Sequence, residues 1–431
     1  MKKILLVSLG CAKNSVDSEA ILKIFLKAGF LETSNPDEAD LILINTCGFI
    51  ESAKAENIDT ILSFINYPAK KVVTGCLVER YYDELKEAIP EVDLWIKFSD
   101  EYKYLPRLVN KLFDDKLELD EFDIYDRNEN VNDGVLYLKV SEGCNKFCAF
   151  CAIPYIRGRF VSYEEDKLIE FVKNSAKSHY FYEVDVIGQD PTSYGLDLKN
   201  GTSLITLLKK LEALEEVKKI RLLYLYPSGI SDELIATIKN SKKIMHYFDI
   251  PIQHVSTKIL KLMNRRDTKE STIGVLNKIR EEIPDAVFRT TLIVGFPGET
   301  YREFNSLYNF VEKFRFNNLG VFTYSPEEGT KAYNLQNQVR ESTKIKRKEA
   351  LLNLQKGISY NLNKDLIGKV FECYVIKKNI KNYEVRLYLN APDDIDGKVY
   401  MVSDIELKPG DIKKIRITNA FVYDLYGEIA E

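Results

Sequence analysis

Three cysteines within eight residues form the segment of this sequence best suited to chemistry. Cys144, Cys148 and Cys151 follow directly after an expected strand at residues 135–140. Thiolates bind zinc and iron–sulfur clusters, but a structural zinc site needs a fourth ligand and a ferredoxin-type cluster needs four cysteines. No further cysteine or histidine lies near the motif in the sequence. The spacing therefore indicates a metal centre that keeps one coordination position open for another molecule.

A second set of three cysteines is spread over the first hundred residues. Cys11, Cys47 and Cys76 each adjoin a glycine at the end of an expected strand, and these strands span residues 3–8, 40–45 and 71–74. Because the carboxyl ends of parallel strands meet at one edge of a sheet, the three thiols are expected to share a site. That site would again lack a fourth ligand. The alternative is that they are three small buried apolar side chains.

The composition limits the class of protein. The 431 residues carry 61 basic and 65 acidic side chains, a net charge of −4, which argues against a strongly basic nucleic-acid binder. Seven cysteines are an odd number and few for this length, which argues against a disulfide framework. The apolar run at residues 4–7 is too short for a signal peptide, and no run approaches a membrane span. We expect a cytoplasmic protein without a membrane contact.

The pattern of apolar residues predicts an α/β fold in three parts. Residues 1–115 alternate strand and helix, which predicts a doubly wound domain with a parallel sheet. Residues 130–360 contain six expected strand–helix units, fewer than the eight of a closed barrel, so we expect a partial (β/α)6 barrel. The acidic segment 116–133 is interpreted as a linker. The six central strands are expected at residues 135–140, 183–187, 220–225, 247–250, 287–294 and 319–324.

The C-terminal part, residues 363–431, changes to short alternating strands. Five of them in about 65 residues predict a small antiparallel β-barrel. Cys373 lies in the first of these strands among apolar and aromatic neighbours and is interpreted as a strand residue.

The CxxxCxxC motif and its surroundings resemble the radical S-adenosylmethionine (SAM) enzymes. Phe150 lies between the last two cysteines, where an aromatic residue is usual, and residues 292–299 resemble the strand end that supports SAM. Gln189 and Asp190 follow the second central strand, where the family often has Gly-Gly-Glu. The resemblance implies that the open iron of a [4Fe-4S] cluster binds SAM, and that a donor such as flavodoxin or ferredoxin supplies the electron that cleaves it. The side chains and backbone implied to contact SAM are those of Phe150, Gln189, Asp190, Gly295 and Glu299.

The whole chain resembles one subfamily, the methylthiotransferases. The resemblance covers the three parts, the last of which corresponds to a TRAM domain, and includes the segments at residues 8–19, 45–50 and 75–77. It implies two [4Fe-4S] clusters, one on each cysteine triad, with the N-terminal cluster carrying the sulfur that is methylated and transferred. It also implies that two SAM molecules are used per turnover, as methyl donor and as oxidant.

Two branches of this subfamily act on different substrates. One modifies an adenosine of transfer RNA, and the other modifies an aspartate of ribosomal protein uS12. The segments at residues 251–254, 324–330 and 391–397 resemble the second branch. Residues 363–431 carry 11 basic against 12 acidic side chains, which suits a basic ribosomal protein and argues against a transfer RNA as partner.

The sequence therefore predicts methylthiolation of the β-carbon of an aspartate of uS12, either free or in the small ribosomal subunit. The alternatives are a transfer-RNA adenosine methylthiotransferase and a non-catalytic iron–sulfur or zinc protein that binds the ribosome. No catalytic side chain is assigned. Arg157 and Arg159 follow the cysteine loop, where they would contact a carboxylate of SAM or substrate, or else lie as surface charges.

Overall fold

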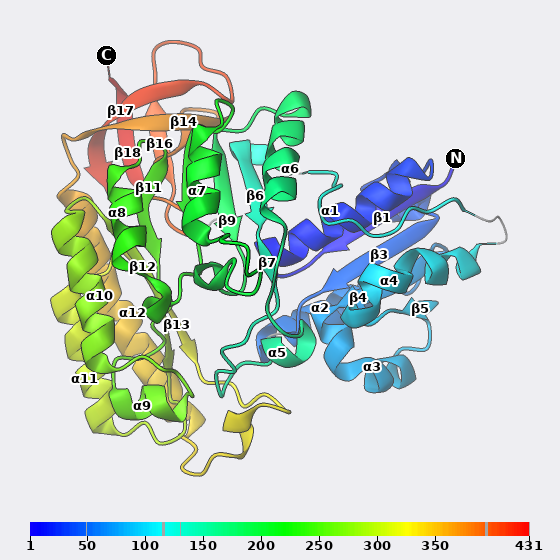
Figure 1. Cartoon of the computed structure of the whole chain (residues 1–431), viewed down its shortest axis with the longest axis horizontal. Coiled ribbons are helices and arrows are strands. Elements are labelled where there is room, and N and C mark those ends of the chain that lie inside the picture. Colours follow the sequence, from blue (N-terminus) through cyan, green and yellow to red (C-terminus); the bar gives the residue numbers. More distant parts are fainter. Residues whose placement is uncertain (49, 114–116, 130, 393–394, 431) are drawn as a thin grey trace.

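The described residues form three large sheets, which follow one another along the sequence, and one short two-stranded sheet (Figure 1). The computed structural model describes residues 1–48, 50–113, 117–129, 131–392 and 395–430. The α/β fold class with a small C-terminal barrel is confirmed.

The N-terminal region is a five-stranded parallel sheet with helices on both faces. Its strands, in sheet order, are β2 (Leu31–Glu32), β1 (Lys3–Ser8), β3 (Leu41–Thr46), β4 (Lys70–Gly75) and β5 (Leu94–Trp95). Its helices are α1 (Ala12–Lys27), α2 (Glu51–Phe64), α3 (Cys76–Ala88) and α4 (Phe98–Val109), with 3-10 turns η1 (Pro36–Glu38) and η2 (Asn110–Leu112). Every residue of β3 is buried because apolar clusters cover both faces. The edge strands β2 and β5 are only two residues long each, which is too short for an alternation of apolar and polar residues to predict them from the sequence.

The central region is an open six-stranded parallel sheet. In sheet order its strands are β13 (Asn318–Thr323), β12 (Val287–Val294), β11 (Ile244–Asp249), β10 (Lys219–Leu222), β9 (Glu183–Ile187) and β6 (Val135–Lys139). All six expected strands are present. Among the described strands β6 and β13 do not pair, so the barrel stays partial.

Helices cover the outer face of this open sheet (Figure 1). They are α6 (Glu165–Ser178), α7 (Leu204–Ala213), α8 (Asp232–Asn240), α10 (Lys269–Glu282), α11 (Tyr301–Phe314) and α12 (Glu341–Lys364). Shorter elements occupy the loops: β7 (Ser141–Glu142), α5 (Ile153–Ile156), β8 (Val161–Ser162), α9 (Thr257–Leu262), η3 (Asn132–Gly134), η4 (Pro191–Ser193), η5 (Pro227–Gly229) and η6 (Lys331–Asn334).

The C-terminal region is a closed five-stranded barrel around its own apolar core. Around the barrel its strands are β14 (Val370–Lys378), β15 (Tyr383–Arg386), β16 (Val399–Val402), β18 (Leu425–Ala430) and β17 (Ile412–Ala420). Four pairings are antiparallel as expected, but β16 and β18 run parallel. Alternation of apolar residues marks a strand without giving its direction, so this pairing could not be predicted. Cys373 is buried in the barrel core, as expected of a strand residue.

The segment interpreted as a linker is packed between the first two regions. Phe122 packs against the N-terminal core, and Arg127 is buried. The Arg127 guanidinium donates to Glu19 of α1 at 3.1 Å and to the carbonyl of Tyr137 in β6 at 2.9 Å. The described part of this stretch has no α-helix or strand and joins the two regions, as a linker does, but it is packed against both of them. The acidic composition of this stretch gave no indication that Arg127 is buried and contacts both regions.

The C-terminal barrel covers the amino ends of the central strands, opposite the cysteine loop. Tyr182, just before β9, stacks on Tyr374 with ring centroids 5.0 Å apart. In the acidic loop at residues 391–397, the side chain of Asp396 turns inward. It is buried and accepts a hydrogen bond from Tyr247 at 2.6 Å. Asp393 and Asp394 lie outside the described residues. The Asp396 carboxylate therefore faces the interior of the protein and is not available to a basic partner.

Candidate functional site

The central cysteines lie in the loop between β7 and α5, at the carboxyl end of the central sheet. Backbone hydrogen bonds fix this loop at both ends. The Cys144 amide donates to the carbonyl of Gly158 at 3.2 Å, and the Ala149 amide donates to the carbonyl of Met263 at 2.8 Å. These two hydrogen bonds hold the backbone of the cysteine loop in place.

The three cysteines of this loop are half-buried. Burial raises the pKa of Cys144 to about 11 and raises those of Cys148 and Cys151 as well. Three neighbouring thiolates at such a place are costly unless a cation offsets their charge. A metal centre does this, since cysteine binds metals as thiolate and loses its proton on binding. The donor set therefore fits an iron–sulfur cluster.

The N-terminal cysteines meet at the carboxyl edge of the N-terminal sheet. Cys11 caps α1, Cys47 follows β3, and Cys76 is the first residue of α3. Glycines let the three loops touch: a Cβ on Gly10 would lie 2.6 Å from Cβ of Cys47, and one on Gly48 would lie 2.7 Å from Cα of Leu77. The expected convergence of the three loops is thus present.

The thiols of Cys76 and Cys11 in this second triad have pKa values shifted in opposite directions. Burial raises the pKa of Cys76 to about 12. At Cys11 desolvation also raises the pKa, but the positive charges of Lys13 and Arg157, together with hydrogen bonds from the backbone N–H groups of Asn14 and Lys13, lower the pKa below its ordinary value. Two of the thiols also lie at helix N-termini, where the helix dipole stabilises a thiolate. These residues suit an anionic, metal-bound sulfur set.

Neither triad is arranged around a single ion. Within the described ranges no three His, Cys, Asp or Glu side chains form a group that would hold one metal ion. A four-iron cluster differs from a single ion because each cysteine binds a different iron, so its thiolates stay further apart.

Phe150 and Gly295 lie on neighbouring loops. The Phe150 ring meets Phe296 edge-on, with centroids 6.5 Å apart. Gly295 follows directly after β12 and has a φ of +72°, a conformation that favours glycine, and its amide donates to the Glu299 carboxylate. Burial raises the pKa of Glu299 to about 7, and Arg347 lies 3.5 Å from its Oε2. Glu299 therefore closes its own loop through Oε2, while its Oε1 is buried with no hydrogen-bond partner among the described residues.

Gln189 and Asp190 both connect to the cysteine loop. The Gln189 amide donates to Glu142 at 2.8 Å, while its Oε1 is buried with no hydrogen-bond partner among the described residues. Asp190 accepts from Ser193 at 2.6 Å and pairs with Lys146 of the cysteine loop at 3.2 Å. Gln189 thus keeps an acceptor available, whereas Asp190 is occupied in holding the loop.

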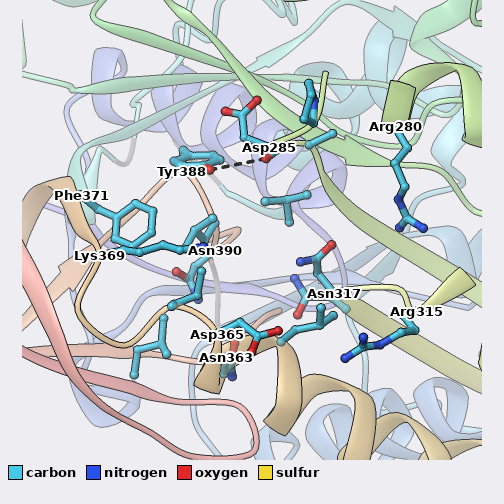
Figure 2. Close-up of a pocket in the computed structure, with 18 of the residues that line it drawn as sticks. Arg280, Asp285, Arg315, Asn317, Asn363, Asp365, Lys369, Phe371, Tyr388 and Asn390 are labelled. Atoms are coloured by element: carbon cyan, nitrogen blue, oxygen red, sulfur yellow. Dashed lines mark hydrogen bonds between the residues drawn. The ribbon is translucent and has the colours of Figure 1, made fainter. Parts of the chain in front are cut away.

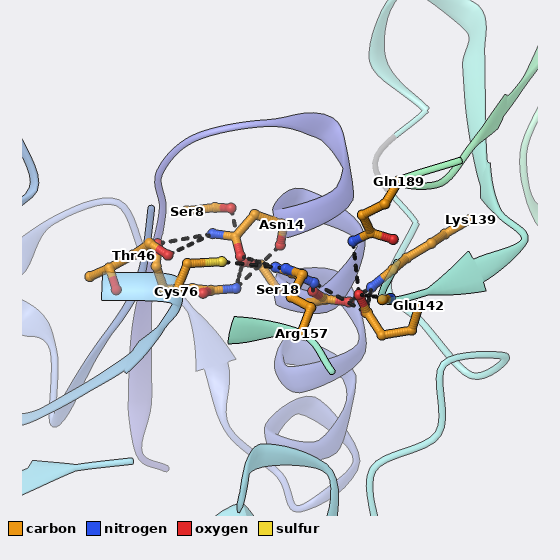
Figure 3. A network of polar contacts seen from close by, with 12 residues as sticks. Ser8, Asn14, Ser18, Thr46, Cys76, Lys139, Glu142, Arg157 and Gln189 are labelled. Atoms are coloured by element: carbon orange, nitrogen blue, oxygen red, sulfur yellow. Dashed lines mark hydrogen bonds and ion pairs between the residues drawn. The ribbon is translucent and has the colours of Figure 1, made fainter. Parts of the chain in front are cut away.

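Sequence reasoning missed the polar network that joins the two cysteine sites (Figure 3). Arg157 is buried, and its Nε donates to the sulfur of Cys76 at 3.3 Å. Its other partners include Glu142, which precedes the cysteine motif, and residues of α1. The surface-charge alternative for Arg157 is wrong. Arg159 is exposed and stacks on the ring of Phe147, 4.5 Å from its centroid. Buried charges of this kind leave no periodic signal in a sequence.

The pocket drawn in Figure 2 lies away from both triads. It has a volume of about 580 Å³ and lies between the central sheet and the C-terminal barrel, lined by residues such as Arg280, Arg315, Lys369 and Tyr388. None of the predicted site residues lines it. No described helix is both long and apolar enough to cross a membrane.

Comparison with known proteins relates the whole chain to one group. The chain is 43% identical to a ribosomal protein uS12 methylthiotransferase, RimO, of Acetivibrio thermocellus, over 99% of this chain and 98% of that protein. It is 44% identical to the protein of the same name from Aquifex aeolicus, over 100% and 98%. The chain belongs to the RimO methylthiotransferase family. Three family models match it in order: Uncharacterized protein family UPF0004 at residues 3–97, Radical SAM superfamily at 138–311 and TRAM domain at 367–430.

A more distant structural likeness supports the fold of this RimO-family chain. It superimposes on the radical SAM methyltransferase TsrM of Kitasatospora setae with a TM-score of 0.55, at 12% identity, over 77% of this chain and 74% of that one. The radical SAM and methylthiotransferase predictions are confirmed by these matches. The family implies an iron–sulfur cluster and SAM as cofactors.

Proposed function

We propose that this chain adds a methylthio group to the β-carbon of an aspartate of ribosomal protein uS12. The observation that carries the proposal is the pair of three-cysteine sites at the carboxyl edges of two parallel sheets, connected by the Arg157 contact to Cys76 at 3.3 Å. One site alone would suit a simple radical SAM enzyme. A second site next to it gives a place for the sulfur that is transferred.

Each triad would hold a [4Fe-4S] cluster. Cys144, Cys148 and Cys151 would bind the cluster that binds SAM, and the N-terminal triad, Cys11, Cys47 and Cys76, would bind the second. When bound and reduced by a donor such as flavodoxin or ferredoxin, the first cluster would supply the electron that cleaves SAM to methionine and a 5′-deoxyadenosyl radical.

Chain residues would position SAM beside the cysteine loop. The buried Oε1 of Gln189 is an acceptor suited to an ammonium group, and its donation to Glu142 fixes the amide. The Phe150 ring and the Gly295 turn would shape the neighbouring wall. Asp190 would act through the loop that it holds, since its carboxylate already binds protein groups. Glu299 would hold the Gly295 turn through Oε2 and leave its buried Oε1 available to SAM.

The substrate would be uS12, either free or in the assembled small subunit, in the cytoplasm. We retain the divisions 1–115, 130–360 and 363–431 as three domains. The relatives named for uS12 modification support this substrate over a transfer RNA.

A peptide assay tests the proposed reaction. The full chain is reconstituted with iron and sulfide, given SAM, a reductant and a peptide of the uS12 loop, and the peptide is examined by mass spectrometry. The expected result is a gain of one methylthio group on the aspartate. An unmodified peptide alongside a modified transfer RNA would favour the RNA-directed alternative. Zinc in place of iron in the purified chain would favour the binding protein.

A further inference from the structure

Arg157 reaches from the central region into the N-terminal region. It follows α5, directly after the cysteine loop, and is only 6% exposed. Its Nε–H donates to Sγ of Cys76 at 3.3 Å, although the two residues are 81 positions apart.

The remaining nitrogens of Arg157 are held by fixed acceptors. One terminal nitrogen donates to Asp17 at 2.8 Å and to Glu142 at 3.1 Å, and the other donates to Asn14 at 3.0 Å. Because the guanidinium is a rigid planar fork, fixing two of its nitrogens also fixes the direction of the third. Contacts with the N-terminal region (Asp17 and Asn14) and with the central region (Glu142) thus direct the Nε–H of Arg157 at Cys76.

The surrounding network is balanced in charge without Cys76. Lys139 contacts both Asp17 and Glu142, so two cations meet two carboxylates (Figure 3). The Arg157 guanidinium also lies over the Phe98 ring at 4.4 Å, which shields it from water. Its hydrogen bond to sulfur therefore acts at low local dielectric, where such a bond is strong.

We propose that Arg157 is a positioning residue for the N-terminal iron–sulfur cluster, and that its hydrogen bond to Cys76 raises the reduction potential of that cluster. The inference rests on the proposed function, because it assumes that the N-terminal triad binds a cluster. A hydrogen bond to a ligating sulfur stabilises the reduced, more negative cluster, and such bonds are among the factors that set cluster potentials. The same bond keeps Cys76 facing the cysteine loop of the central sheet.

The test isolates the N-terminal cluster in the full-length chain. Cys144, Cys148 and Cys151 are replaced together by alanine, and the remaining cluster is titrated with reductant while its EPR signal is recorded. When Arg157→Gln is added to this triple-alanine variant, the midpoint reduction potential of the N-terminal cluster should become lower, and the line shape of its EPR signal should change. The matched control is Arg159→Gln, which removes an exposed arginine two residues away and should leave both unchanged.

The outcomes separate the inference from the proposed function. If the triple-alanine parent binds no iron, the N-terminal cluster and the proposed function are wrong. If the triple-alanine parent binds about four irons, and Arg157→Gln leaves the midpoint potential and EPR line shape of the cluster unchanged, the proposed role of Arg157 is wrong while the proposed function stands. If circular dichroism shows that Arg157→Gln does not fold, Arg157→Lys replaces it under the same criterion, because lysine keeps the charge but loses the fork that aims at Cys76.

Discussion

The buried charges between the two cysteine sites should dominate the stability of their interface. Lys139 is 2% exposed and contacts the carboxylates of Asp17 and Glu142. Lys139→Met removes one of the two cations, Lys139 and Arg157, that pair with these two buried carboxylates. Breaking a buried pair in this way costs about 3–5 kcal/mol, because one charge stays buried without compensation. With a urea m-value of ~3 kcal/mol/M, the unfolding midpoint would fall by about 1–2 M.

A second substitution makes this prediction specific. Lys139→Met combined with Glu142→Gln removes one cation and one anion together, so most of the lost stability should return. Lys167→Met is the matched control, since Lys167 forms an exposed pair with Glu164 at 2.8 Å, and such pairs contribute at most about 1 kcal/mol. Urea titrations of the apoprotein, followed by circular dichroism, measure all of these variants. A midpoint for Lys139→Met equal to that of the control, or a double variant no more stable than the single one, would refute the reasoning.

Three further predictions concern single residues. Cys148→Ala should abolish reductive SAM cleavage, measured as 5′-deoxyadenosine by chromatography; persistent cleavage would rule out the radical SAM role of the loop. Cys373→Ala should leave the iron content unchanged and cost about 1 kcal/mol of stability, because its thiol only fills the barrel core; a loss of iron would make Cys373 a ligand. Burial raises the pKa of Glu299 to about 7, so the folded chain binds this proton more tightly than the unfolded chain, and stability should fall by about 3 kcal/mol as the pH rises from about 4.5 to about 7. Glu299→Gln should remove that decrease in urea titrations, and an unchanged pH profile would contradict it.

The strands and the positions of the cysteines could be predicted because both depend on local sequence. An apolar run such as β3 is buried on both faces of the sheet. A cysteine that directly follows such a run therefore lies where the carboxyl ends of the strands meet. Cys11, Cys47 and Cys76 could therefore be assigned to one edge although they are far apart in the chain. The six central strands follow from the same pattern.

Features that depend on long-range pairing could not be predicted. Arg157 looks like any arginine after a loop, and only the packing of two sheets shows that it faces Cys76. Asp396 lies in a turn-like sequence, yet the docking of the barrel buries it against Tyr247. In both cases the decisive partner is on another domain, and charge alone suggests solvent exposure.

The iron content of the reconstituted chain tests the central claim most directly. Two triads, each holding a four-iron cluster, predict about eight irons per chain and about four when either triad is replaced by alanine. The reduced protein should also show EPR signals from two distinct clusters. About four irons in the unaltered chain, all lost when Cys144, Cys148 and Cys151 are replaced, would contradict a second cluster and with it the account of sulfur transfer.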